Sequence, residues 1–130
     1  MTGTGNLSTS RQLVAIVDDE PSVLRGLKRL LDARGFATNV FHSGEEFLQS
    51  DGASNATCVV LDIHLDGISG IETRRALTAR GSGIPVIFMT AVDTAAVRRE
   101  AMDTGCVAYL RKPFSGCELI DAIRNATSAT

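Results

Sequence analysis

The chain has 130 residues, of which 44% are hydrophobic, and its formal net charge is −2. This length fits one domain with an ordinary hydrophobic core that needs neither disulfides nor a structural metal. A slightly acidic chain lacks the positive charge that direct nucleic-acid binding requires, and no apolar stretch approaches the roughly 20 residues of a membrane span. Residues 1–10 also lack the pattern of a secretory signal, so we expect one compact cytoplasmic domain.

The chain begins with an apolar strand and a long helix. Residues 13–17 are wholly apolar, as expected for a parallel strand that is covered on both faces. Asp18 and Asp19 follow this strand directly. Pro21 suits the first turn of a helix, the leucines after it recur at helical spacing, and Gly35 predicts where that helix ends.

The next elements are shorter. Residues 36–41 alternate weakly between apolar and polar side chains, which predicts a second strand. Ser43 can cap a short helix that extends through Leu48. Residues 50–55 are small and polar, and we predict a surface loop there.

Two further strands each end at a polar side chain. Residues 57–62 form the third predicted strand, which ends at Asp62 and is followed by a glycine-punctuated loop over 65–70. A helix is then expected to extend to residue 80. Residues 84–90 form the fourth predicted strand, which ends at Thr90.

The last part of the chain completes an alternating pattern. We predict a helix over 94–104, a strand over 106–110 and a helix over 114–126, which gives five strands and five helices. Strict alternation implies right-handed crossovers and an α/β fold with a doubly wound, five-stranded parallel sheet. We expect a flexible tail over 1–11, the domain over 12–126, and a C-terminal tail or the start of a linker over 127–130.

Other polar and reactive side chains are interpreted without a special role. The basic pairs at 74–75 and 98–99 are expected to be solvated helix positions. The cysteines form no CxxC pair and have no histidine nearby at metal-ligand spacing, so we predict reduced thiols that are buried or half-buried. They are Cys58, Cys106 and Cys117.

The polar residues at the strand ends predict one site. In a doubly wound sheet the functional crevice lies at the carboxyl ends of the strands, so the side chains that follow the first, third and fourth strands should meet there. A single aspartate after a strand is more often a turn residue, so the prediction depends on all of them converging. They are Asp18, Asp19, Asp62 and Thr90.

This combination suits the acceptance of a phosphoryl group. Crowded carboxylates either raise one another's pKa or hold a divalent cation, and an all-oxygen site suits Mg²⁺ or Mn²⁺. Attack of an Asp62 oxygen on phosphorus would give an aspartyl-phosphate. The ammonium of Lys112 would stabilise charge on the phosphoryl oxygens, and Thr90 would form a hydrogen bond to the transferred group.

On these residues the chain resembles a response-regulator receiver domain of the CheY-like superfamily, from about residue 12 to 125. The family's acidic pair, phosphoacceptor, switch hydroxyl and lysine–proline step match, in chain order, Asp18-Asp19, Asp62, Thr90 and Lys112-Pro113. The segments 41–48, 68–72 and 111–114 are most similar to the FixJ/NarL-type branch. The resemblance implies a flavodoxin-like fold and a role in two-component signal transduction.

The resemblance also implies how the site binds its metal. The family's direct ligands correspond to the carboxylates of Asp19 and Asp62 and to the backbone carbonyl of His64, whereas Asp18 would act through metal-bound water. We interpret the imidazole of His64 as a solvent-facing group beside the site, and His42 as a surface residue.

In the family, phosphorylation draws the switch hydroxyl toward the phosphoryl group, and an aromatic residue rotates inward. Here these residues are Thr90 and Tyr109. The bland alternative for Tyr109 is a half-buried strand aromatic without a switching role. The resemblance implies that the face formed by 94–104, 106–110 and 114–126 changes and that it can mediate a phosphorylation-dependent homodimer. A cis peptide bond is implied before Pro113.

The implied partner is a sensor histidine kinase or a histidine phosphotransfer protein, docked on residues 21–34 and on the loop after the fifth strand. The domain would be a phosphoacceptor that catalyses its own phosphotransfer and slow dephosphorylation, without being an enzyme in the usual sense. The cognate kinase, the stimulus and the output stay open. A pseudo-receiver that only docks to partners is one alternative. A magnesium-dependent phosphatase of the haloacid-dehalogenase type is another, but it needs a second acid where His64 stands.

Two positions depart from the family pattern. Asp66 replaces a proline that is usual in the loop after the phosphoacceptor, which puts the rigidity of that loop in doubt. Val92, two residues after Thr90, offers no polar group to orient water. We therefore hypothesise a longer-lived phosphoryl group, unless His64 takes over that role.

Overall fold

The computed structural model describes residues 11–127 and contains one parallel sheet of five strands in the order β2-β1-β3-β4-β5. The strands are β1 (Leu13–Val17), β2 (Ala37–Phe41), β3 (Cys58–Asp62), β4 (Val86–Thr90) and β5 (Ala108–Arg111). The helices are α2 (Pro21–Ala33), α3 (Gly44–Gln49), α4 (Gly52–Asn55), α5 (Gly70–Ala79), α6 (Ala95–Asp103) and α7 (Gly116–Thr127). The predicted doubly wound parallel sheet is confirmed.

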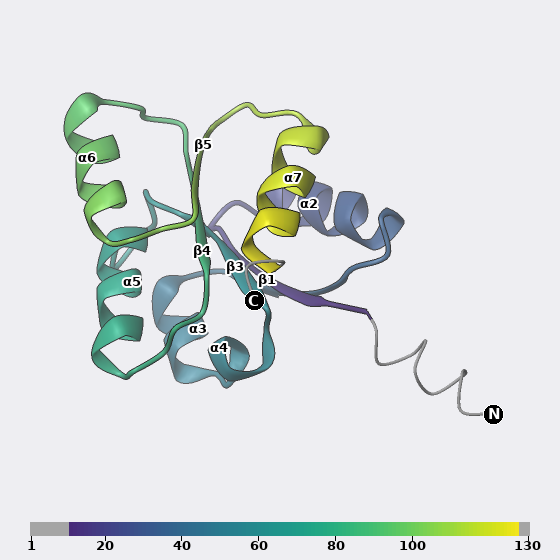
Figure 1. Ribbon diagram of the computed structural model, residues 1–130, viewed down its shortest axis with the longest axis horizontal. Helices are drawn as coiled ribbons and strands as arrows, with labels where there is room; N and C mark the ends of the chain where they lie inside the picture. Colours follow the sequence, from purple (N-terminus) through teal and green to yellow (C-terminus); the bar gives the residue numbers. More distant parts are fainter. Residues whose placement is uncertain (1–10, 128–130) are drawn as a thin grey trace.

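The sheet lies between two layers of helices. Helices α2 and α7 cover one face, and α3, α5 and α6 cover the other (Figure 1). Strands β3 and β4 are buried along their whole length, and β1 is buried from Val14 onward. One apolar cluster joins the sheet to α2 and α7, and a second joins it to the opposite layer. Burial on both faces explains why these strands are continuous apolar runs in the sequence.

Side-chain caps begin several of the helices. The hydroxyl of Ser43 accepts a hydrogen bond from the Glu46 N–H at the start of α3, as predicted. Ser69 forms a reciprocal capping box with Glu72 at the start of α5, and Thr94 caps α6. Such a cap contributes about 1 kcal/mol to helix stability. These caps fix where the loops at the carboxyl ends of β3 and β4 turn into helices.

The prediction of five helices was wrong, because the described residues contain six. The additional helix, α4, is a single turn inside the segment 50–55 that we predicted to be a loop. Four residues are too few to show helical periodicity, so the sequence pattern does not indicate a helix there. Most other predicted boundaries differ from the structure by one or two residues.

The predicted terminal tails, 1–11 and 127–130, lie almost entirely outside the described residues. Arg11 precedes β1, and Thr127 is the last residue of α7, so the final helix extends one residue past its predicted end. Within residues 11–127, no helix combines the length and the apolar character needed to cross a membrane.

Two interpretations of single side chains were wrong. Arg74 is not simply solvated, because its guanidinium donates hydrogen bonds to the backbone oxygens of Ile84 at 3.1 Å and Thr104 at 3.4 Å. It thereby ties α5 to the segments that flank β4 and β5. Cys117 is exposed rather than buried, whereas Cys58 is buried and Cys106 is half-buried, and all three thiols are free.

Candidate functional site

Three carboxylates meet at the carboxyl end of the sheet. Oxygen atoms of Asp18, Asp19 and Asp62 lie within 4.8 Å of one another. The cause is the register of the central strands. Val17 pairs with Leu61, so the next residues of the two segments, Asp18 after β1 and Asp62 at the end of β3, emerge side by side. Asp18 is fully buried and Asp62 is only 5% exposed. The structure therefore brings together the acids that the sequence predicted at strand ends.

Lys112 balances part of this negative charge. Its Nζ atom donates hydrogen bonds to Asp18 Oδ2 at 2.8 Å and to Asp62 Oδ2 at 3.3 Å. The peptide bond between Lys112 and Pro113 is cis, as predicted. Burial opposes the charged ammonium, but the two carboxylates outweigh burial and raise the pKa of Lys112 above its ordinary value.

The carboxylate oxygens of Asp18 and Asp19 accept different numbers of hydrogen bonds. Asp18 Oδ1 accepts a hydrogen bond from the Glu20 N–H at 2.9 Å, so both oxygens of Asp18 are engaged. Asp19 Oδ2 accepts one from the Asp66 N–H at 3.0 Å. Among residues 11–127, Asp19 Oδ1 has no hydrogen-bond partner. Asp19 thus keeps one oxygen without a competing hydrogen bond, whereas both oxygens of Asp18 already accept one.

The pKa of Asp62 reflects this crowding. Burial and, after it, the charge of Asp18 raise the pKa of the Asp62 carboxyl from 3.8 to about 6, although Lys112 and the His64 N–H partly offset the rise. Three carboxylates share one ammonium, which leaves a net negative charge at a site where Asp18 and Asp62 are buried from solvent. Such a cluster, built of oxygen ligands, fits Mg²⁺ or Mn²⁺.

Thr90 lies beside the carboxylates at the end of β4. Its hydroxyl is buried and accepts a hydrogen bond from the Val92 N–H at 3.0 Å. The Thr90 Oγ1 atom also lies 3.2 Å from Nδ1 of His64, within hydrogen-bonding distance. His64 is exposed, as predicted, but its ring contacts Thr90, which the sequence reasoning missed. His64 and Thr90 are 26 residues apart in sequence, and the ring reaches Thr90 only because of the path of the loop after β3.

Comparison with known proteins decides the family. The model of the response regulator receiver domain matches residues 14–124. The chain belongs to this family. It is 37% identical over 125 residues to the transcriptional regulatory protein TdiR of Thauera aromatica, covering 96% of this chain and 53% of TdiR. It is 35% identical over 111 residues to the transcriptional regulatory protein FixJ of Azorhizobium caulinodans, covering 85% of this chain and 53% of FixJ.

The receiver domain spans about half the length of these curated relatives. A crystal structure of FixJ-N superposes with a TM-score of 0.83 at 32% identity, and the match covers 93% of this chain and 97% of that one. The predicted similarity to the FixJ/NarL-type branch is confirmed. This chain is therefore a receiver domain of two-component signalling, and receiver domains generally bind Mg²⁺ at an acidic cluster of the kind seen here.

In this receiver domain, the backbone behind Asp62 is tightly packed. A Cβ atom placed on Gly70 would lie 2.2 Å from the carbonyl oxygen of Asp62, closer than real atoms approach. The Gly70 N–H donates to the Ile63 carbonyl at 2.8 Å. The first residue of α5 must therefore be glycine for the end of β3 to keep its place. The sequence reasoning had treated Gly70 only as part of a loop.

The loop after β3 is held at two points. The Asp66 N–H donates to Asp19, and the Ile68 N–H donates to Glu45 Oε2 at 3.0 Å. A proline, which is usual in the family where Asp66 stands, has no N–H and could not make the first of these bonds. The departure at this position therefore adds a contact to one acid of the cluster.

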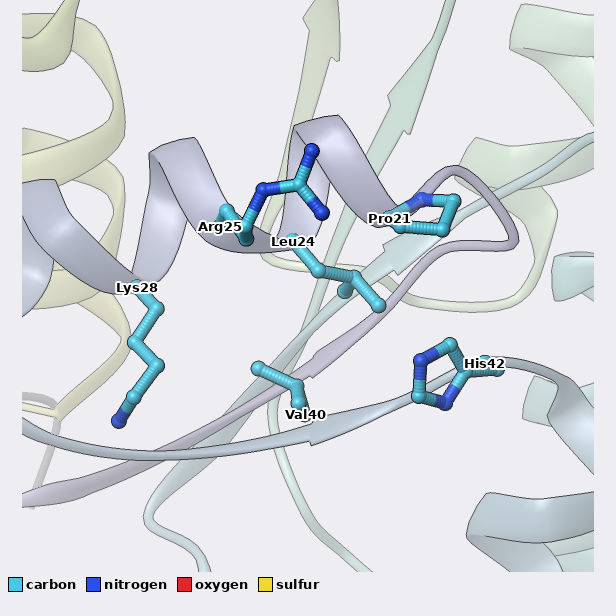
Figure 2. Close-up of a pocket in the computed structure, with 6 residues that line it drawn as sticks. All are labelled: Pro21, Leu24, Arg25, Lys28, Val40 and His42. Atoms are coloured by element: carbon cyan, nitrogen blue, oxygen red, sulfur yellow. The ribbon is translucent and has the colours of Figure 1, made fainter.

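A separate hollow of about 160 Å³ lies between α2 and the edge strand β2 (Figure 2). Leu24 and Val40 form its apolar base, while Arg25, Lys28 and His42 surround it. His42 is exposed, as predicted. None of the three clustered carboxylates lines this hollow, so it is distinct from the site at the strand ends.

Proposed function

We propose that this receiver domain accepts a phosphoryl group on Asp62 from a phosphohistidine of a sensor histidine kinase or a histidine phosphotransfer protein. In this transfer, an Asp62 oxygen forms the new bond to phosphorus while the bond from phosphorus to the histidine nitrogen breaks, and the imidazole takes up a proton. The observation that carries the proposal is the Lys112 ammonium bonded to Asp62 within a cluster of three carboxylates.

The residues around Asp62 have separable roles in this proposal. Lys112 lies 3.3 Å from an Asp62 oxygen, so its ammonium would stabilise negative charge on the phosphoryl oxygens. Thr90 would donate its hydroxyl to the phosphoryl group after leaving its present partners. The domain would catalyse its own phosphorylation and slow dephosphorylation, with no separate substrate to turn over.

A divalent cation, Mg²⁺ or Mn²⁺, fits the cluster. We propose that Asp19, Asp62 and the backbone carbonyl of His64 hold it directly and that Asp18 contributes through water. Asp19 has an oxygen without a hydrogen-bond partner among residues 11–127, which supports its role as a direct ligand. Asp18 Oδ2 is bonded to Lys112 at 2.8 Å, which supports a less direct role for Asp18. When bound, the cation would offset the negative charge of the carboxylates and of the incoming phosphoryl oxygens.

Phosphorylation would then change the face formed by α6, β5 and α7. The movement of Thr90 would allow Tyr109 to rotate inward, and the changed face could bind a partner or a second copy of the domain. We place this activity in the cytoplasm, and we expect no direct contact of this domain with nucleic acid. A nearly neutral charge balance, with 13 basic and 15 acidic residues, supports the last point.

The test is intact mass spectrometry after incubation with acetyl phosphate, with and without Mg²⁺. The wild type should gain one phosphoryl group only with the metal, and Asp62→Asn should gain none. Asp51→Asn, which removes an exposed carboxylate away from the cluster, should behave as the wild type. A folded wild type that gains no adduct would refute the proposal and favour a docking module. Sustained turnover of phosphate esters would instead favour a phosphatase.

A further inference from the structure

Tyr109 is held by two side chains outside the carboxylate cluster. Its hydroxyl donates a hydrogen bond to Asp93 Oδ1 at 2.9 Å. The guanidinium carbon of Arg98 lies 4.6 Å from the centre of the Tyr109 ring, and Arg98 Nε lies 3.7 Å from the same Asp93 oxygen. The phenol, the carboxylate and the guanidinium therefore all contact one another. Arg98 was predicted to be a solvated helix position and is exposed, but its contacts with Tyr109 and Asp93 were not predicted.

These contacts combine strong interactions with partial burial. The Asp93 side chain is 20% exposed, so its hydrogen bond to the phenol is partly shielded from water, whereas the Arg98 side chain is 53% exposed. A hydrogen bond to an ionised acceptor is about twice as strong as one between neutral groups. Burial and the Asp93 carboxylate raise the pKa of Tyr109 to about 12, so the phenol remains a donor at neutral pH.

The same short segment connects this triad to Thr90. Asp93 lies three residues after Thr90, in the loop that leads into α6, and the intervening Val92 N–H donates to the Thr90 hydroxyl at 3.0 Å. If the hydroxyl moves, Val92 loses this bond and the backbone next to Asp93 is released. Arg98 lies on α6 itself, so the triad joins the loop, α6 and β5.

We infer that Asp93 and Arg98 are positioning residues that hold Tyr109 in its resting orientation and thereby set how easily phosphorylation switches this receiver domain. This inference rests on the proposed function, because phosphorylation of Asp62 is what would move Tyr109 out of its resting orientation. Loss of the Asp93 bond removes one charge-assisted contact, which corresponds to about a tenfold change in the ratio of resting to switched Tyr109.

The composition allows a direct test, because Tyr109 is the only tyrosine in the chain. NMR spectra of protein with ¹³C-labelled tyrosine rings would report this one residue, before and after phosphorylation with acetyl phosphate and Mg²⁺. The variants are Asp93→Ala, Asp93→Asn and Arg98→Gln. The matched control is Glu100→Gln. Glu100 lies on α6, as Arg98 does, and the substitution removes an exposed ion pair with Arg75 of α5 that involves no member of the triad.

In Asp93→Ala without phosphorylation, the ring resonance should move part of the way toward its position in the phosphorylated wild type. Asp93→Asn keeps a neutral acceptor and should show a smaller shift. The phenol pKa, followed by phenolate absorbance, should fall in Asp93→Ala and rise in Arg98→Gln, because the carboxylate raises it and the guanidinium lowers it. Glu100→Gln should change neither quantity.

An unchanged ring resonance in both Asp93 variants, with a normal phosphoryl adduct on Asp62, would overturn the inference and leave the proposed function standing. Equal shifts in Asp93→Ala and Glu100→Gln would also overturn it, because the effect would then belong to α6 in general. If the folded wild type takes no phosphoryl group, the proposed function fails, and the switching role of the triad falls with it.

Discussion

Replacing Asp62 with asparagine is expected to stabilise the metal-free domain, although Asp62 is the proposed phosphoacceptor. The Asp62 carboxyl has a pKa of about 6 in the folded chain, against an ordinary value of 3.8. The folded state therefore binds this proton more tightly than the unfolded state does. The free energy of unfolding falls as pH rises through the window between these two values, and above about pH 6 the whole cost is present.

The magnitude follows from the size of the shift. A rise of about two pKa units corresponds to a cost of about 3 kcal/mol at pH 7.5, and to about half of that at pH 5. Asparagine removes the charge but leaves Lys112 with only Asp18 as an ionic partner. We therefore expect a net gain of about 1 to 2 kcal/mol at pH 7.5, or roughly 5 °C in the midpoint of thermal unfolding.

The assay is urea unfolding followed by circular dichroism, in EDTA, at pH 7.5 and pH 5. The gain of Asp62→Asn over the wild type should be larger at the higher pH by about 1.5 kcal/mol, the amount by which the cost of the Asp62 charge changes between the two pH values. Asp51→Asn, at an exposed position, should show little gain at either pH. Added Mg²⁺ should then stabilise the wild type more than Asp62→Asn. A variant no more stable than the wild type at pH 7.5, or a gain that grows toward pH 5, would refute the electrostatic reasoning.

Two other substitutions test the packing around the cluster. Gly70→Ala should lower the free energy of unfolding by about 1 to 3 kcal/mol and slow phosphorylation, because the new methyl group displaces the Asp62 carbonyl. Gly83→Ala, whose added carbon meets open space, should do neither. Lys112→Ala should cost about 3 kcal/mol in urea unfolding at neutral pH, because it leaves the buried Asp18 carboxylate without its ammonium partner. A Lys112→Ala variant as stable as the wild type would show that this ion pair contributes nothing net.

The sequence predicted most of the fold because its central strands are buried on both faces and therefore appear as uninterrupted apolar runs. It also predicted that Asp18, Asp19, Asp62 and Thr90 converge, because parallel strands place their carboxyl ends at one edge of the sheet. Helix α4 was missed because a single turn of small residues has no periodic pattern. The strands and the converging residues could be predicted because they follow from regular strand geometry. Helix α4 could not, because it is too short to produce a regular pattern.

The contacts that sequence reasoning missed all depend on where loops place their side chains. His64 reaches Thr90, and Arg98 reaches Tyr109, only because separate loops and helices turn them toward these partners. Arg74 likewise finds backbone oxygens that no spacing rule identifies. A charged or polar residue on a helix is indistinguishable in sequence from a solvated one until the neighbouring element is placed against it.

The absence of space between Gly70 and the Asp62 carbonyl has a mechanical consequence. The start of α5 cannot shift toward the end of β3, and the hydrogen bond from Gly70 to Ile63 resists their separation. On the other side of Asp62, the loop after Thr90 is largely exposed and is held by a few hydrogen bonds. We therefore expect a change at Asp62 to displace the loop that leads into α6 more easily than the start of α5.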